Sequence, residues 1–248
     1  MGRGNHRVGG RDPAKSPESS SARWGAAVLG LLALAACSRP PRPAVAAAAL
    51  PPAPAGGPCL RLDAAHSDVR VLVYRAGPLA QLGHNHVLVA HALAGELCAG
   101  RFALTVPVAA LAVDPAAARA EEGVDFATVP SAADVAGTRE HLLGASQLGA
   151  DAWPVIRVSG TLPAGAGPVA VAARLEVRGI LANVAVPTSI TVDPEGRMVV
   201  AGGFELAQTS LGLVPYSVAL GALRVRDEVA VRFRLVAVQD GDPPMARP

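Results

Sequence analysis

Apolar and polar side chains alternate along most of the chain after Leu60. This period of two is typical of β-strands that have one buried face and one solvated face. The clearest run spans 223–235, where one face would carry Leu223, Val225, Val229, Val231, Phe233 and Leu235 and the other mostly arginines. A helix would distribute these charges around its whole circumference. The alternation therefore predicts a domain built mainly from β-strands.

The chain contains about eight such runs, separated by turn-forming clusters such as 163–167 and 193–196. The other runs lie at 69–74, 87–93, 101–106, 155–159, 169–178, 184–192 and 198–206. So many antiparallel strands predict a sandwich or a closed barrel, and closure would remove the exposed edges of the sheet.

One segment, 121–153, lacks the alternation. Within it, Ser131 can cap the start of a short helix that runs through His141, and Gly144 can end this helix. We therefore expect an all-β fold with a short helical insertion.

The first 36 residues resemble an export signal. Basic residues precede an apolar stretch, 24–36, which is too short to cross a bilayer and ends in small residues. The sequence Leu34-Ala35-Ala36-Cys37 then resembles the lipobox of bacterial lipoproteins. We expect residues 1–36 to be removed and Cys37 to be acylated, which would anchor the protein in the bacterial cell envelope, facing the periplasm. The alternative is a plain signal peptide, with Cys37 an incidental thiol.

Residues 37–58 are rich in Pro and Ala and have no periodic apolar face, so we interpret them as an extended tether. The folded domain, 59–240, and a disordered tail, 241–248, would follow. Loss of residues 1–36 removes five of the 22 Lys and Arg and two of the 20 Asp and Glu, leaving a net charge of about −1. This charge, without a basic cluster, argues against nucleic-acid binding.

Two further cysteines, Cys59 and Cys98, lie in the expected domain. An even number of cysteines in an exported protein suggests a disulfide between them. The alternative is two unpaired thiols, with Cys98 packed in the core.

The apolar faces of the strands would meet inside the fold. Their side chains are mostly Val, Ala and Leu, and Phe supplies the only aromatic rings among them. Eight strands can enclose either a filled interior or a cavity for one ligand. The candidate lining of such a cavity is Val71, Val73, Phe102, Leu104, Val171, Leu175, Phe204, Val231 and Phe233. An ordinary filled core remains the alternative, because β-branched residues are common in strands generally.

Residues 62–238 resemble the YceI-like family of exported, lipocalin-like proteins that are associated with polyisoprenoid and other amphiphilic lipids. The resemblance rests on six short phrases in order, HSDV at 66–69, REHL at 139–142, WPVIRV at 153–158, LEVRGI at 175–180, TSLGL at 209–213 and VRDEV at 225–229. It implies an eight-stranded antiparallel barrel with an apolar channel for a lipid tail and no catalytic residues. The expected function is therefore binding of an amphiphilic lipid or isoprenoid, as a carrier or store, without a further cofactor.

His84 and His86 are two residues apart, so on an extended chain both side chains would project from the same face. They could share a metal ion if His91 or His66 supplied a third ligand, which would make the domain a metal- or redox-associated binding module. Alternatively, they are polar residues at the rim of a barrel, or they hold the head group of a lipid.

Enzyme motifs are missing from the chain. It has no G-x-S-x-G, P-loop, C-x-x-C or H-E-x-x-H sequence. We therefore expect a binding protein without catalytic activity.

Overall fold

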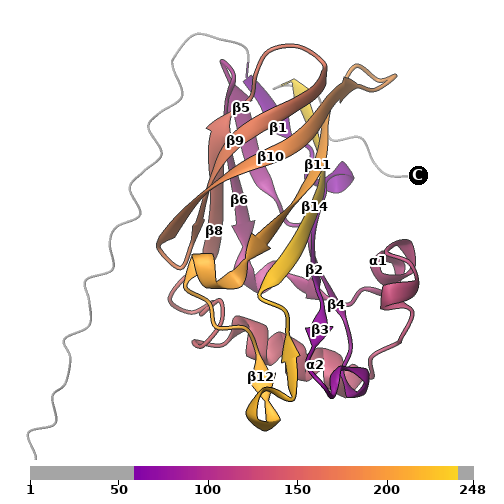
Figure 1. The fold of residues 1–248 in the computed structure, drawn as a ribbon. Coiled ribbons are helices and arrows are strands. Elements are labelled where there is room, and N and C mark those ends of the chain that lie inside the picture. Colours follow the sequence, from indigo (N-terminus) through magenta and orange to yellow (C-terminus); the bar gives the residue numbers. More distant parts are fainter. Residues whose placement is uncertain (1–58, 240–248) are drawn as a thin grey trace, which may run out of the picture. The chain divides into compact units, whose positions relative to one another are not determined.

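A computed structural model describes residues 59–239. The expected signal peptide, Cys37, the tether and the tail lie outside the described residues. The described chain forms a closed, eight-stranded antiparallel barrel (Figure 1). In order around the barrel, its strands are β1 (Cys59–Leu62), β5 (Ala94–Cys98), β6 (Arg101–Pro107), β8 (Val155–Thr161), β9 (Gly167–Val177), β10 (Ile180–Val192), β11 (Met198–Ala207) and β14 (Glu228–Gln239). β14 pairs with β1 and closes the ring, so the predicted fold class is confirmed.

Two positions of the barrel hold interrupted strands. The 3-10 helix η1 (Ala64–His66) separates β1 from β2 (Asp68–Val73), and both strands pair with β14. The second interrupted strand consists of β4 (His86–Ala90) and β5. Its first part, β4, pairs with β2, and its second part, β5, pairs with β1. Buried Ser67 holds the first interruption in place, because its hydroxyl donates to the carbonyl of Asp63 and accepts from the N–H of Val236 on β14.

The long connections all leave the same end of the barrel, which we call the loop-bearing end. The first, 74–85, contains β3 (Arg75–Ala76) and η2 (Ala80–Leu82). The second, 108–154, contains η3 (Val108–Ala110), β7 (Ala112–Val113), α1 (Ala116–Glu121), η4 (Val124–Phe126) and α2 (Ala132–Leu143). The third, 208–227, contains η5 (Gln208–Leu211), β12 (Ser217–Val218), η6 (Ala219–Gly221) and β13 (Leu223–Val225). β7 pairs with β4, and β12, β13 and β3 form a separate small sheet. The opposite end, which we call the far end, carries only the short connections 99–100, 162–166 and 193–197.

The expected helix is α2. Ser131 is its N-cap and forms a capping box with Asp134, and Gly144 is its C-cap. The helical insertion is thus confirmed, and the same connection, 108–154, also contains α1, while a further excursion at 208–227 contains only 3-10 helices and short strands. α1 has only six residues, and its place depends on long-range contacts of Arg119 that the local sequence does not reveal.

Two expected strand faces also differ from the structure. The alternation in 69–74 puts Leu72 on the face opposite Val71 and Val73, which is the solvated face in the expected barrel, but Leu72 is fully buried with Val87 and Val89 beneath Phe126 of η4. Leu223, expected in the last barrel strand, lies in the small sheet. Local alternation cannot show that a distant segment covers the outside of a strand.

Cys59 and Cys98 form a disulfide and lie directly opposite each other on β1 and β5. The bond joins the short first strand to its neighbour at the far end, beside the closure of the barrel.

Candidate ligand-binding site

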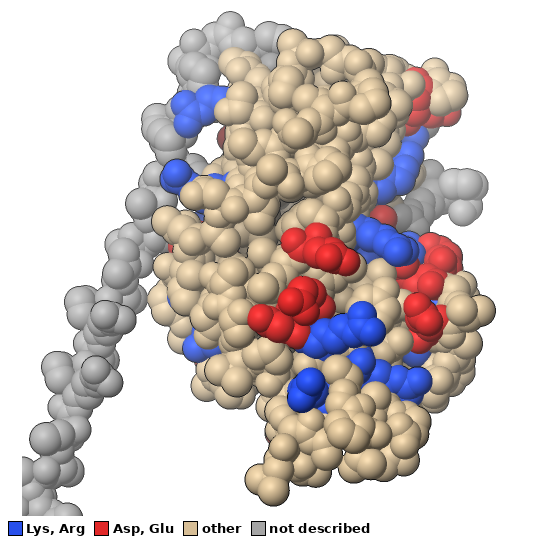
Figure 2. Space-filling view, viewed as in Figure 1, with Lys and Arg blue, Asp and Glu red and all other residues tan. Residues whose placement is uncertain are grey.

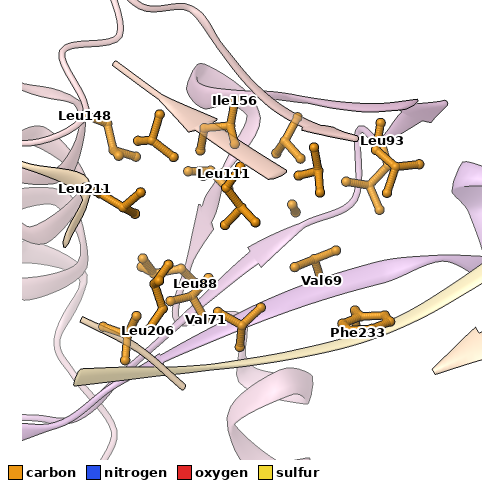
Figure 3. A pocket seen from close by; sticks show the side chains of 18 of the residues that line it. Val69, Val71, Leu88, Leu93, Leu111, Leu148, Ile156, Leu206, Leu211 and Phe233 are labelled. Carbon is orange, nitrogen blue, oxygen red and sulfur yellow. The ribbon is translucent and has the colours of Figure 1, made fainter. Parts of the chain in front are cut away.

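A cavity of about 880 Å³ occupies the barrel, which is within the range of ligand pockets in proteins. Its lining extends from Leu60 near the far end to Tyr216 at the loop-bearing end, and most of it is apolar. Side chains from different walls, such as Val69 and Leu111, point into the same space (Figure 3). The barrel is therefore hollow, and the alternative of a completely filled core is not observed.

The structure brings together all nine residues predicted to line a cavity. They come from five strands, with Val71 and Val73 on β2, Phe102 and Leu104 on β6, Val171 and Leu175 on β9, Phe204 on β11, and Val231 and Phe233 on β14. Their placement follows from the pleat, which turns every second side chain inward. Their part in binding a ligand stays a prediction.

Two phenylalanine rings cover glycines on neighbouring strands. Phe102 is paired with Gly160 across β6 and β8, and a Cβ at Gly160 would lie 2.7 Å from Cζ of Phe102. Phe233 is paired with Gly202 in the same way across β14 and β11. Because each ring lies against backbone that has no side chain, the aromatic residues line the wall and leave room inside the barrel.

The lining becomes more polar at the loop-bearing end, beside α2. There His141, Ser146 and Tyr216 are both exposed and part of the lining, and Thr138, Gln147 and Gln208 add polar groups. The rings of His141 and Tyr216 meet edge to face, with centroids 4.5 Å apart. We call these six residues the cavity mouth. The site is thus an apolar chamber with a polar opening.

His86 also lines the cavity, and a buried network holds its imidazole. Nδ1 of His86 lies 2.7 Å from Oδ2 of Asp114, and Oδ1 of Asp114 accepts from the N–H of Val87 at 2.9 Å and from Nη1 of Arg119 at 2.6 Å. Arg119 also donates to the carbonyl of Asn85. The network fixes the orientation of a polar ring in an otherwise apolar wall.

The pKa of Asp114 reflects these contacts. Burial by itself would raise the pKa, but hydrogen bonds from His86, Val87 and Arg119 and the charge of His86 outweigh it and hold the pKa below 3.8. Asp114 is therefore a carboxylate at neutral pH, and its charge is matched by Arg119.

The histidine pair is not arranged as a complete metal site. The rings of His84 and His86 are 6.2 Å apart, and Nε2 of His84 lies 3.7 Å from Oδ2 of Asp134 on α2. Within 59–239, no three His, Cys, Asp or Glu residues are grouped closely enough to hold a metal ion, so neither His66 nor His91 completes the pair. The observed contacts of His86 suit a hydrogen-bonding role.

Sequence reasoning missed the mouth and the network behind His86. Asp114 and Arg119 are only five residues apart, and both reach β4 because 108–130 folds back along that strand. There Asp114 and Val87 exchange backbone and side-chain hydrogen bonds. The Asp114-Pro115 step ahead of an Ala-rich stretch could have indicated the start of α1. No local signal indicates its buried partners.

None of the helices between residues 59 and 239 is long and apolar enough to cross a membrane.

Solved structures match this barrel. A polyisoprenoid binding domain from Saccharophagus degradans, described as implicated in plant cell wall breakdown, matches with a TM-score of 0.53, covering 75% of this chain and 100% of its own at 14% identity. BcnA from Burkholderia cenocepacia matches with a TM-score of 0.51, covering 71% of this chain and 99% of its own at 16% identity. The chain has the fold of these two proteins. The eight-stranded antiparallel barrel that the sequence resemblance implied is therefore observed here, and its fold matches both of these proteins. No family model and no curated protein matches the sequence.

Proposed function

We propose that the protein binds the apolar tail of an amphiphilic lipid or isoprenoid inside the barrel, with the polar head of the ligand at the cavity mouth. The hollow interior, enclosed by strands and lined mainly by hydrocarbon, carries this proposal. The shared fold with a domain described as polyisoprenoid binding supports it.

Binding would be driven by burial of the tail. Each methylene group that leaves water for the Val and Leu lining contributes about 0.8 kcal/mol. Ten buried methylenes would contribute about 8 kcal/mol before the cost of ordering the ligand is subtracted. The Tyr216 hydroxyl and the imidazoles of His86 and His141 offer hydrogen bonds to a head group near the opening.

Binding without chemistry is the activity that this arrangement supports. Asp114 and Arg119 are engaged with each other and with backbone groups. The Ser210 hydroxyl donates to the carbonyl of Ala207. These groups stabilise the loop-bearing end, and an apolar chamber gives little support to a charged transition state.

We also propose that the protein is exported and held in the cell envelope by lipid on Cys37. This rests on the apolar stretch 24–36 and on Leu34-Ala35-Ala36-Cys37. A mature N-terminus at an acylated Cys37, found by mass spectrometry of the protein from membranes, is the expected result. An intact N-terminus or an unmodified Cys37 would contradict it.

Native mass spectrometry of the purified protein, compared with the denatured protein, tests ligand binding. A non-covalent lipid would add mass that disappears on denaturation, whereas acyl chains on Cys37 would remain. Val231→Trp places a large ring in the cavity and is expected to abolish the added mass. Ala172→Trp makes a comparable addition on the exposed face of β9 and is expected to retain the lipid.

Thermal unfolding must show that both variants are folded. Equal lipid retention by folded Val231→Trp and Ala172→Trp would place the ligand outside the barrel and refute the proposal. A mass increment removed by a chelator would instead indicate a metal ion.

A further inference from the structure

We propose that the loop-bearing end of the barrel docks on a lipid bilayer through an apolar projection, the hairpin tip, defined as residues 214–222. This deepens the proposed function, since a lipid would pass between bilayer and cavity at the mouth. Docking and ligand retention are nevertheless separate properties and are tested separately.

Exposed apolar side chains are distributed very unequally between the two ends of the barrel. Of the eleven large hydrophobic side chains that are exposed within 59–239, ten lie on connections or strand ends at the loop-bearing end. Val192 alone lies at the far end. Single exposed hydrophobic residues are ordinary on soluble proteins, but their concentration at one end indicates a surface that meets an apolar partner.

The hairpin tip is the most prominent part of this surface. Residues 211–223 contain no charged side chain, and Val214, Val218 and Leu220 are exposed, with Leu220 fully so. Ala219, Leu220 and Gly221 all have positive φ angles, although only glycine accepts that conformation readily. The backbone thus holds an apolar side chain outward at some conformational cost, which is typical of functional loops.

The base of the tip has the composition of a membrane interface. Tyr216 lies at the start of the projection, and Arg224 and Arg75 follow on the paired strands β13 and β3. Figure 2 shows the projection at the bottom of the molecule free of charge, with arginine side chains above it. On docking, the apolar residues of the tip would meet the acyl chains, and the Tyr216 ring behind them would lie at the interface. The arginines farther back would meet anionic head groups.

Continuity with the cavity favours a bilayer over a protein partner. Tyr216 belongs both to the mouth and to the hairpin tip, so docking would bring the opening to the lipid surface. Neighbouring loops would reach the same surface. The N–H of Leu79 donates to the carbonyl of Ala222 in the hairpin tip. The side-chain amide of Asn85 donates to the carbonyl of Asp125, next to exposed Val124. This end is convex and apolar at its projection, which suits insertion between lipids better than a flat protein interface.

The proposed anchor permits this orientation. Cys59 leaves the barrel at the far end, opposite the tip, and is 22 residues after Cys37. A chain of that length can reach up to about 75 Å. The eleven residues of β9 rise only about 36 Å. An acylated Cys37 would therefore allow the loop-bearing end to turn toward the same membrane.

Fluorescence quenching in vesicles tests the docking. The full chain, with both native tryptophans replaced (Trp24→Phe and Trp153→Phe), is mixed with vesicles of phosphatidylcholine brominated on its acyl chains and one quarter phosphatidylglycerol. Leu220→Trp is expected to lose fluorescence at least about twofold on vesicle binding, because its ring would enter the acyl boundary. The matched control Val192→Trp, exposed at the far end, should not be quenched.

Several outcomes would overturn the proposal. Unquenched Leu220→Trp, or equal quenching of Leu220→Trp and Val192→Trp, would do so. A dimer in analytical ultracentrifugation that Leu220→Asp dissociates, without quenching of Leu220→Trp, would make a second copy the occupant. Native mass spectrometry of Leu220→Asp separates the docking proposal from the cavity proposal. If this variant no longer docks but still carries its lipid, the cavity function is intact. The Val231→Trp result tests the cavity alone.

Discussion

The ring of Phe233 covers Gly202 on the neighbouring strand. A Cβ at Gly202 would lie 2.9 Å from Cζ of Phe233 and would collide with the carbonyl oxygen of Pro187 on β10. The pair therefore combines two functions, since the missing side chain lets the strands approach and lets an aromatic ring lie along the wall of the cavity.

Gly202→Ala should lower the free energy of unfolding by about 1–3 kcal/mol, because an added methyl group forces the ring or the backbone of β10 to move. For a domain of this size, each kcal/mol lowers Tm by about 2–4 °C. Thermal denaturation followed by circular dichroism measures the change. Gly137→Ala is the matched control, since nothing lies within 4 Å of its Cβ position on α2, and it should be neutral or slightly stabilising. Equal Tm values for the two variants would refute the close approach.

Removal of the disulfide by Cys59→Ser/Cys98→Ser should destabilise the barrel. The bond spans 39 residues, and closing a loop of that length is worth about 4 kcal/mol in the chain-entropy model. Urea denaturation of the double variant and of the oxidised protein gives the difference, and the reduced protein provides a second comparison. Coincident unfolding curves would show that β1 is held by its strand pairing alone.

Asp114→Asn should destabilise the fold at neutral pH, since it leaves Arg119 buried without its counter-charge. The expected loss is about 3 kcal/mol. The pKa of Asp114 is held below 3.8 in the folded state, so its charge stabilises the protein above that pH, and the contribution disappears as pH falls through the lowered value. The difference between the protein and the variant should therefore be largest near pH 7 and shrink below about pH 3.8.

Chemical denaturation across this pH range checks the prediction. Asp151→Asn, which removes an exposed carboxylate, provides the control and should have little effect at any pH. A loss of stability for Asp114→Asn that stays constant from pH 7 to pH 3 would mean that the charge of Asp114 is not what stabilises the network.

The existence of most strands and the inward face of each could be predicted from the sequence. The alternation in residues 223–235 and 169–178 is a local property, because the pleat alone sends successive side chains to opposite faces. The same applies to α2, since Ser131 and Gly144 act within one turn of the helix that they limit. The nine lining residues followed from this pattern.

Whether the barrel was hollow could not be decided in that way. The free space depends on where Phe102 and Phe233 place their rings relative to Gly160 and Gly202, which are distant in sequence. The network of His86, Asp114 and Arg119 likewise joins the start of β4 to the distant segment 114–119 through buried contacts.

Local periodicity by itself determined that this chain forms amphipathic strands with an apolar inner face. Only the tertiary structure decided that the strands enclose a cavity, that the long connections gather at one end and that Leu220 projects from that end. The physical reason is that alternation depends on the geometry of neighbouring residues, whereas empty volume and exposed surface depend on how distant segments pack together.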